Sequence, residues 1–151
     1  MTAEMVERAR ANVARAGFAN VEVRQGIIEE LPVESGSVDW VISNCVINLS
    51  PEKDRVFAEI ARVLKPGGRM RVSDIVVDDL PEALRADMVL YASCVAGAVS
   101  EAEYLDGLLR AGLVDVAVVE RYPYGTEVLP GIGDIADRVV SAKIAARKPD
   151  A

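Results

Sequence analysis

Two cysteines, Cys45 and Cys94, are the residues of this chain with the most distinctive chemistry. Each lies in a short apolar segment, residues 43–49 after a strand-like run and residues 91–98 at the end of a helix-like run. If the fold brings both thiols together beside a pocket, they can bind a soft, thiol-seeking ligand, because thiolates prefer soft centres. If it does not, they are ordinary core residues, since free cysteine is among the most buried residue types. Both interpretations are open at this point.

The sequence of 151 residues contains no histidine. This excludes Ser–His and Cys–His nucleophile pairs, imidazole general bases and histidine-ligated zinc. Two cysteines are too few for a four-thiolate zinc site or a disulfide framework, and such low cysteine usage is typical of a reducing compartment. We therefore expect a cytoplasmic protein whose chemistry comes from carboxylates, thiols, backbone groups or a bound cofactor.

The composition indicates one soluble globular domain over residues 1–151, with 51% hydrophobic and 27% charged residues. The formal net charge of −7 disfavours nucleic acid as a partner, because a phosphate backbone requires a basic face. No run of apolar residues is long enough to span a membrane, and the N-terminal segment does not have the pattern of a signal peptide.

Helical and strand-like patterns alternate along most of the chain. Helices are predicted over residues 3–16, 51–64 and 100–111 and from Pro81 onward. Thr2 and Ser100 are the predicted caps of the first and third of these helices, and Gly17 is the predicted stop of the first. Strands are predicted over residues 21–25, 38–43, 69–77, 113–120 and 138–147. The run 38–43 is mostly apolar, which predicts an interior strand covered on both faces. Trp40 and Phe57 are expected in the core. The order predicts an α/β fold with a mostly parallel sheet and an antiparallel closing hairpin.

Several motifs then resemble one known family. The segment 26–32, the strand 38–43 and the turn Leu64-Lys65-Pro66-Gly67-Gly68 are together similar to class I S-adenosylmethionine-dependent methyltransferases, which have a Rossmann-like fold. The two cysteine segments, Ser43-Asn44-Cys45-Val46-Ile47-Asn48-Leu49 and Tyr91-Ala92-Ser93-Cys94-Val95-Ala96-Gly97-Ala98, resemble signatures of the arsenite methyltransferases. Residues 139–149 are similar to the end of bacterial members. The resemblance implies transfer of a methyl group from S-adenosyl-L-methionine to arsenic(III), for arsenic detoxification.

The resemblance also implies a set of site residues. Cys45 and Cys94 would be the catalytic residues and the arsenic(III) ligands, with arsenite or its thiol conjugates as substrate. Met1, Ile27 and Ile28 would line the adenine pocket, and Ser43 and Asn44 would border the methionine portion of the cofactor. Methyl transfer from a sulfonium depends mainly on positioning, so the lack of an imidazole base is compatible with it.

The chain also departs from the family. Members begin their nucleotide site with a strand, a glycine-rich turn and a second strand that ends in an acidic residue, and they carry a further cysteine in that region. The sequence matches none of these, so we interpret it as the C-terminal part of a catalytic domain that lacks strands 1 and 2 of the family order 3-2-1-4-5-7-6. That gap would separate residues 21–25 from 38–43 by roughly 14 Å. We expect re-pairing of these strands, a homo-oligomer, a strand-swapped dimer or a second polypeptide.

Two other functions are compatible with these residues. A related small-molecule methyltransferase acting on carbon, oxygen or nitrogen would share the Lys-Pro-Gly-Gly turn but would have no use for both cysteine segments. A thiol-based arsenic-binding module would keep the two ligands without turnover. Asp74 could be a site carboxylate near a strand end, a turn residue or a surface residue. Asn44 and Asn48 could cap a turn or face a ligand. Residues 122–133 could form a lid or an ordinary connection.

Overall fold

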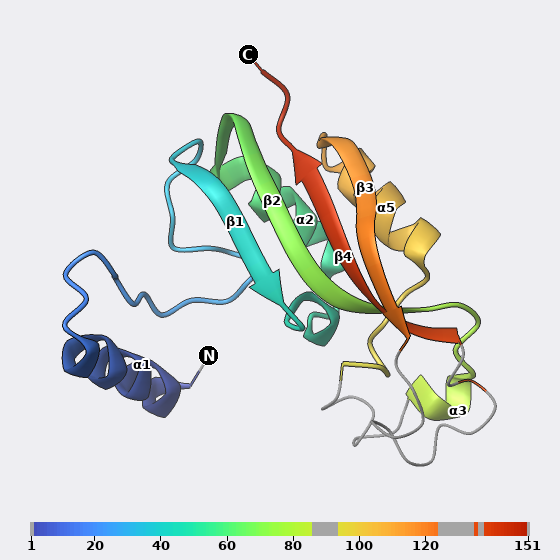
Figure 1. The fold of residues 1–151 in the computed structure, drawn as a ribbon, viewed down its shortest axis with the longest axis horizontal. Coiled ribbons are helices and arrows are strands. Elements are labelled where there is room, and N and C mark those ends of the chain that lie inside the picture. Colours follow the sequence, from blue (N-terminus) through green and yellow to red (C-terminus); the bar gives the residue numbers. More distant parts are fainter. Residues whose placement is uncertain (1, 86–93, 124–134, 136–137, 151) are drawn as a thin grey trace.

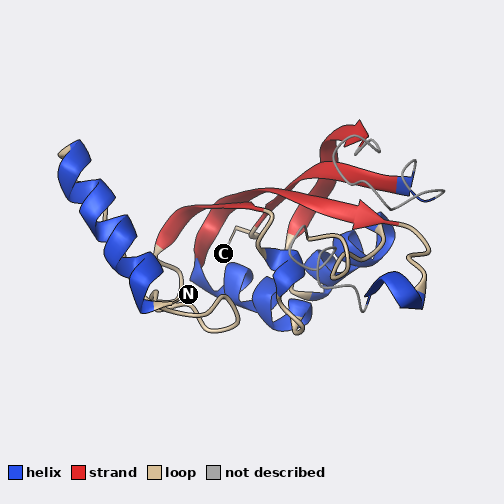
Figure 2. Ribbon diagram, turned by 90° about the horizontal axis from the view of Figure 1, so that it is seen from below, coloured by secondary structure: helices blue, strands red, loops and turns tan. Residues whose placement is uncertain are grey.

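A computed structural model describes residues 2–85, 94–123, 135 and 138–150. Its strands are β1 (Val38–Asn44), β2 (Leu64–Val77), β3 (Val114–Pro123) and β4 (Val139–Arg147), and its helices are α1 (Ala3–Ala16), the 3-10 turn η1 (Ile47–Leu49), α2 (Lys53–Val63), α3 (Glu82–Arg85) and α5 (Glu101–Arg110). The four strands form one sheet, and α1 stands apart from it (Figure 1). Helices α2 and α5 lie on the same side of the sheet (Figure 2).

The sheet has the strand order β1-β2-β4-β3. Strands β1 and β2 are parallel, and β4 runs antiparallel to both of its neighbours. This order corresponds to positions 4-5-7-6 of the expected arrangement, so the α/β class and the closing antiparallel hairpin are confirmed. Among the described strands a single pairing is parallel. The parallel part of the sheet is therefore smaller than expected, because residues 21–25, predicted as a further strand, are not paired in it.

The strand predicted over residues 21–25 is wrong for this chain. These residues have no strand pairing in the structure. The guanidinium of Arg24 binds the Glu22 carboxylate and the carbonyl oxygen of Pro32, at 3.0 Å. A strand needs a neighbour that takes up its backbone hydrogen bonds, and the described part of the chain offers none beside this segment. Re-pairing is thus not observed, and the homo-oligomer or swapped dimer stays a prediction.

The helix ends follow local sequence signals. Thr2 caps α1 by accepting a hydrogen bond from the Met5 amide, and Gly17 ends it with a φ of 70°. The predicted cap of α5 is confirmed, since the Ser100 hydroxyl accepts from the Glu103 amide. Helix α2 begins at Lys53 rather than at Pro51. The helix expected from Pro81 is described over Glu82–Arg85, and most of its remainder lies outside the described residues.

The main core lies between the sheet and the α2 and α5 helices. The rings of Phe57 and Tyr104 pack with their centroids 5.0 Å apart, which confirms Phe57 as a core residue. The prediction for Trp40 is wrong: it is 50% exposed, beneath the Arg69 guanidinium, and Ile42 is 78% exposed. One face of β1 is therefore open, because both helices that cover the sheet lie on its other side (Figure 2). No helix in the described ranges is long and apolar enough to cross a bilayer.

Candidate functional site

The two cysteines lie together in the structure, although they are 49 residues apart in sequence. Cys45 directly follows β1, and its amide donates to the Ser73 carbonyl of β2 at 2.9 Å. This bond extends the parallel pairing one residue past the strand. The Sγ atom of Cys94 donates to the carbonyl oxygen of Cys45 at 3.0 Å. Of the two interpretations left open by the sequence, the structure favours the one in which the thiol segments meet.

Both cysteines have an unusual backbone conformation. Cys45 has a φ of 51° and Cys94 a φ of 66°, in the left-handed region that residues other than glycine seldom adopt. Such a conformation costs about 1–3 kcal/mol and persists where the surrounding structure enforces it. Both are free thiols, with Cys94 buried and Cys45 half-buried. Two neighbouring segments thus present thiols from strained backbone at one place.

The surroundings of the thiols keep them protonated near neutral pH. Burial is the main cause that raises the pKa of both, to about 11 for Cys94. The nearby Asp74 carboxylate raises both values further, because it repels a thiolate. A ligand that forms covalent bonds to sulfur displaces these protons as it binds. A reagent that reacts only with the thiolate should react slowly, because the thiolate fraction is small near neutral pH.

Alkylation should therefore be slow at both cysteines. At pH 8 we expect iodoacetamide to modify the folded chain at least about tenfold more slowly than it modifies free cysteine, because the thiolate fraction falls as the pKa rises. The rate should increase as the pH rises toward 11. Mass spectrometry of quenched time points measures it, and the urea-unfolded chain serves as the control. Equal rates in the folded and unfolded chains would contradict the assigned environment.

A buried polar group lies next to the thiol segments. Asp74 and Asn48 are each 1% exposed, and the Asn48 Nδ2 donates to Asp74 Oδ1 at 2.8 Å. The Tyr104 hydroxyl donates to the other Asp74 oxygen at 3.4 Å. Asp74 is thus neither a surface nor a turn residue, and the side chain of Asn48 does not act as a backbone cap. The Asn48 Oδ1 has no hydrogen-bond partner among the described residues.

The Asp74 carboxyl should make stability depend on pH. Burial raises its pKa from 3.8 to about 6. The folded state then binds this proton more tightly than the unfolded state, so the free energy of unfolding falls as the pH rises from about 4 to 6. We expect Asp74→Asn to be more stable than wild type by up to about 3 kcal/mol at pH 7.5 and by little at pH 4. Urea unfolding at both pH values measures this, and a pH-independent difference would contradict it.

An apolar hollow adjoins the segment that carries Cys45. It has a volume of about 490 Å³ and lies between the start of α1, the 26–29 turn and residues 46–50. A smaller hollow of about 130 Å³ lies beside it, since Ile28 and Val46 line both. Ile27 and Ile28 thus line the larger hollow, and Ser43 lines the smaller one. Asn44 lines neither, and Met1 lies outside the described residues.

Two residues of α2 hold residues 31–33, the segment that follows the 26–29 turn, in place. The Arg62 guanidinium donates to the carbonyl oxygens of Leu31 and Val33, at 3.1 and 2.9 Å, and Glu59 accepts from the Leu31 amide at 2.7 Å. Sequence reasoning missed this pair because its partners lie 28 to 31 residues away. The wall formed by Ile27 and Ile28 is thereby tied to a rigid helix.

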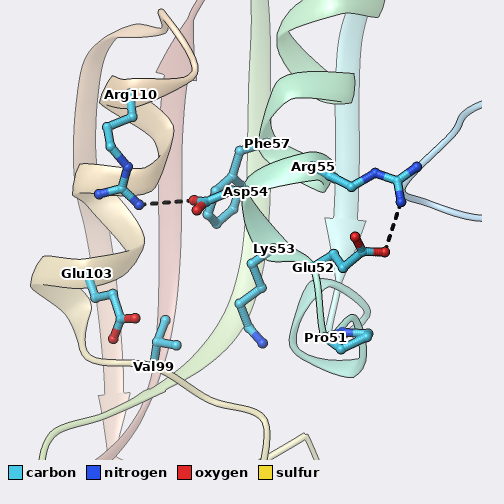
Figure 3. A pocket seen from close by; sticks show the side chains of 9 residues that line it. All are labelled: Pro51, Glu52, Lys53, Asp54, Arg55, Phe57, Val99, Glu103 and Arg110. Atoms are coloured by element: carbon cyan, nitrogen blue, oxygen red, sulfur yellow. Dashed lines mark hydrogen bonds and ion pairs between the residues drawn. The ribbon is translucent and has the colours of Figure 1, made fainter.

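A third hollow, of about 390 Å³, opens between the start of α2 and α5 (Figure 3). Its charged groups are largely paired, since Arg110 binds Asp54 at 3.0 Å and Arg55 binds Glu52 at 2.9 Å. Lys53 donates to the Ser50 carbonyl at 3.0 Å. These contacts stabilise the start of α2. No group of three or more potential ligands among histidine, cysteine, aspartate and glutamate is found in the described part of the chain.

Comparison with known proteins decides the family. A profile described as a methyltransferase domain matches residues 1–112. The chain belongs to this methyltransferase family. It is 43% identical over 153 residues to the arsenite methyltransferase of Halobacterium salinarum, a match over 99% of this chain and 39% of that protein. It is 44% identical over 131 residues to the arsenite methyltransferase of Aquipseudomonas alcaligenes, over 82% of this chain and 38% of that protein.

The solved structures agree with this assignment. The arsenic(III) S-adenosylmethionine methyltransferase of Chlamydomonas reinhardtii superposes with a TM-score of 0.75 at 33% identity, over 99% of this chain and 53% of that one. The expected resemblance and the partial methyltransferase fold are thus confirmed. The chain spans about two fifths of the length of the methyltransferases from H. salinarum and A. alcaligenes. The roles of the individual site residues remain predictions.

Proposed function

We propose that this chain takes part in S-adenosylmethionine-dependent methylation of arsenic(III), with Cys45 and Cys94 as the arsenic ligands. The observation that carries the proposal is the contact between Cys94 Sγ and the Cys45 carbonyl oxygen, at 3.0 Å, in a chain of this family. It brings the two thiol-bearing segments together, beside a residue, Val46, that lines the apolar hollow. Two free thiols support a reducing compartment, and the proposed location is the cytoplasm.

The apolar hollow suits the adenine of the cofactor. Its exposed apolar side chains, among them Ile27 and Val46, offer flat contact to an aromatic ring, and about 490 Å³ is within the range of small-molecule sites. Ser43 lines the smaller hollow nearer to β1 and is the proposed neighbour of the methionine portion. Met1 and Asn44 are proposed contacts on the resemblance alone. When bound, S-adenosylmethionine supplies an activated methyl group on a sulfonium.

The thiols prepare the substrate by ligand exchange. When arsenous acid meets both cysteines, two As–O bonds break and two As–S bonds form, and each thiol proton leaves with a hydroxide as water. The arsenic stays trivalent and keeps its lone pair, which is the nucleophile for a methyl group. Sulfur ligands suit a soft centre. The residues of this chain thereby hold the arsenic atom and fix its direction, which is the main contribution that methyl transfer needs.

The test combines binding and turnover. Arsenite is titrated calorimetrically into wild type, Cys45→Ser and Cys94→Ser, and methylated arsenic is measured with isotopically labelled S-adenosylmethionine. We expect binding that depends on both thiols. Binding that is unchanged in both variants would overturn the proposal and would leave a methyltransferase for another small molecule. Thiol-dependent binding without labelled product would instead identify this chain as an arsenic-binding module.

A further inference from the structure

Asn48 ties the Cys45 segment to the sheet. It lies three residues after Cys45, in η1, and its Nδ2 donates to Asp74 Oδ1 at 2.8 Å and to the Ile75 carbonyl oxygen at 2.7 Å. Both acceptors belong to β2. The buried Asn48 amide is firmly held by its two acceptors. Breaking either hydrogen bond would leave a buried N–H donor unpaired, which costs more free energy than the bond itself contributes. The turn after Cys45 therefore has a fixed position against β2.

The main chain of the same residue contacts the Cys94 segment. A Cβ atom added to Gly97 would lie 2.1 Å from the carbonyl oxygen of Asn48, so the two backbones are packed as closely as glycine allows. Gly97 is three residues after Cys94. The Lys53 ammonium donates to the Asn48 carbonyl from the α2 side, at 3.5 Å. Asn48 thus contacts both thiol-bearing segments and the sheet.

We infer that Asn48, held by Asp74, is a positioning residue that sets the distance between the Cys45 and Cys94 thiols. This inference rests on the proposed function, because it concerns the arsenic-binding geometry of the same pair. The hydrogen bond from the Cys94 thiol to the Cys45 carbonyl oxygen is one contact between the two segments. Asn48 supplies a second contact, because its side chain binds β2 and its carbonyl oxygen packs against Gly97. The two contacts together hold the Cys45 and Cys94 segments against each other.

A trivalent arsenical that binds two thiols at once reports this distance. Phenylarsine oxide reacts with two thiols to form two As–S bonds and one water molecule, which takes both thiol protons and the oxygen, and arsenic stays trivalent. Closing the second bond depends on the effective concentration of the second thiol, which falls when the two are not held together. Iodoacetamide reacts with single thiols and does not report their separation.

The experiment compares variants of the full chain for phenylarsine oxide affinity, measured by competition with a small dithiol. We expect Asn48→Ala and Asp74→Leu to bind on the order of tenfold to a hundredfold more weakly than wild type, with both thiols still present. Asp74→Asn keeps an acceptor for the Asn48 amide, so it should bind as wild type does. Leu108→Ala is the control, because it opens the main core around Phe57 and Tyr104. It should bind within about threefold of wild type.

The outcomes separate this inference from the proposed function. If wild type itself does not bind phenylarsine oxide through both thiols, the proposed function fails. If wild type binds and Asn48→Ala binds equally, the positioning role is overturned while the proposed function stands. Equal losses in Leu108→Ala and Asn48→Ala would also overturn it, since general loosening would then explain them. If circular dichroism shows Asn48→Ala to be unfolded, Asn48→Ser takes its place in the same comparison.

Discussion

Cys94→Ser is expected to bind trivalent arsenic about a thousandfold more weakly than the unmodified chain. The first As–S bond places arsenic beside the second thiol, and the Cys94–Cys45 contact holds that thiol nearby. The second bond then forms within one complex, where the effective concentration is high. A serine hydroxyl at the same position is a hard oxygen donor and a poor ligand for a soft centre. Competition between the protein and a small dithiol for arsenite measures the loss.

Cys45→Ser should lose the same amount, because each thiol depends on the other for the gain. The double variant has no sulfur ligand left and should bind arsenite more weakly than either single variant, which still forms one As–S bond. Cys94→Ala controls for the new hydroxyl and should resemble Cys94→Ser. If both single variants keep arsenite affinity within about threefold of wild type, the two-thiol site is contradicted. A change of that size is ordinary for a substitution that does not touch the binding site.

Gly97→Ala should disrupt the same site without removing a sulfur atom. An added Cβ would lie 2.1 Å from the Asn48 carbonyl oxygen, and the obstructing atom is backbone rather than a movable side chain. The turn that carries Cys94 must therefore move away from the turn after Cys45. We expect a loss of stability of about 1–3 kcal/mol, as for other overpacked sites, and a loss of arsenite affinity on the order of a hundredfold.

A second glycine provides the matched comparison. Gly17 ends α1 with a φ of 70°, and nothing lies within 4 Å of an added Cβ. Gly17→Ala should therefore lower stability through backbone strain alone, with arsenite affinity unchanged. Urea unfolding and calorimetric titration of both variants separate stability from binding. If Gly97→Ala binds arsenite as tightly as Gly17→Ala does, the close approach at Asn48 has no role in holding the thiols together.

Local signals predicted the elements that depend on neighbouring residues. The Thr2 and Ser100 caps, the Gly17 stop and the closing hairpin are all present as expected. Each cap or stop depends on residues within one helical turn. The hairpin depends on two strand patterns that are both present in this chain and pair with each other. The strand over residues 21–25 failed for the opposite reason. Its alternation is genuine, but a strand exists only with a partner, and that partner is not specified by local pattern.

The site was predictable in part. The cysteine segments were found by resemblance to a family, and spacing alone could not show that they meet. The burial of Asp74 has a signal in the sequence: Val72, Asp74 and Val76 alternate on one face of β2, and all three are buried. Its partner Asn48 carried none, because their hydrogen bond joins residues 26 positions apart. Contacts at that separation depend on the packing of the whole sheet.

The left-handed backbone at Cys45 and Cys94 has a consequence for protein engineering. Glycine adopts these torsions with little strain, and asparagine tolerates them better than most residues. A redesign that optimised thermostability alone would therefore tend to replace both cysteines, and the product would melt at a higher temperature while it lost its sulfur ligands. Thermostabilised libraries of this chain should accordingly be screened for thiol content before melting temperature.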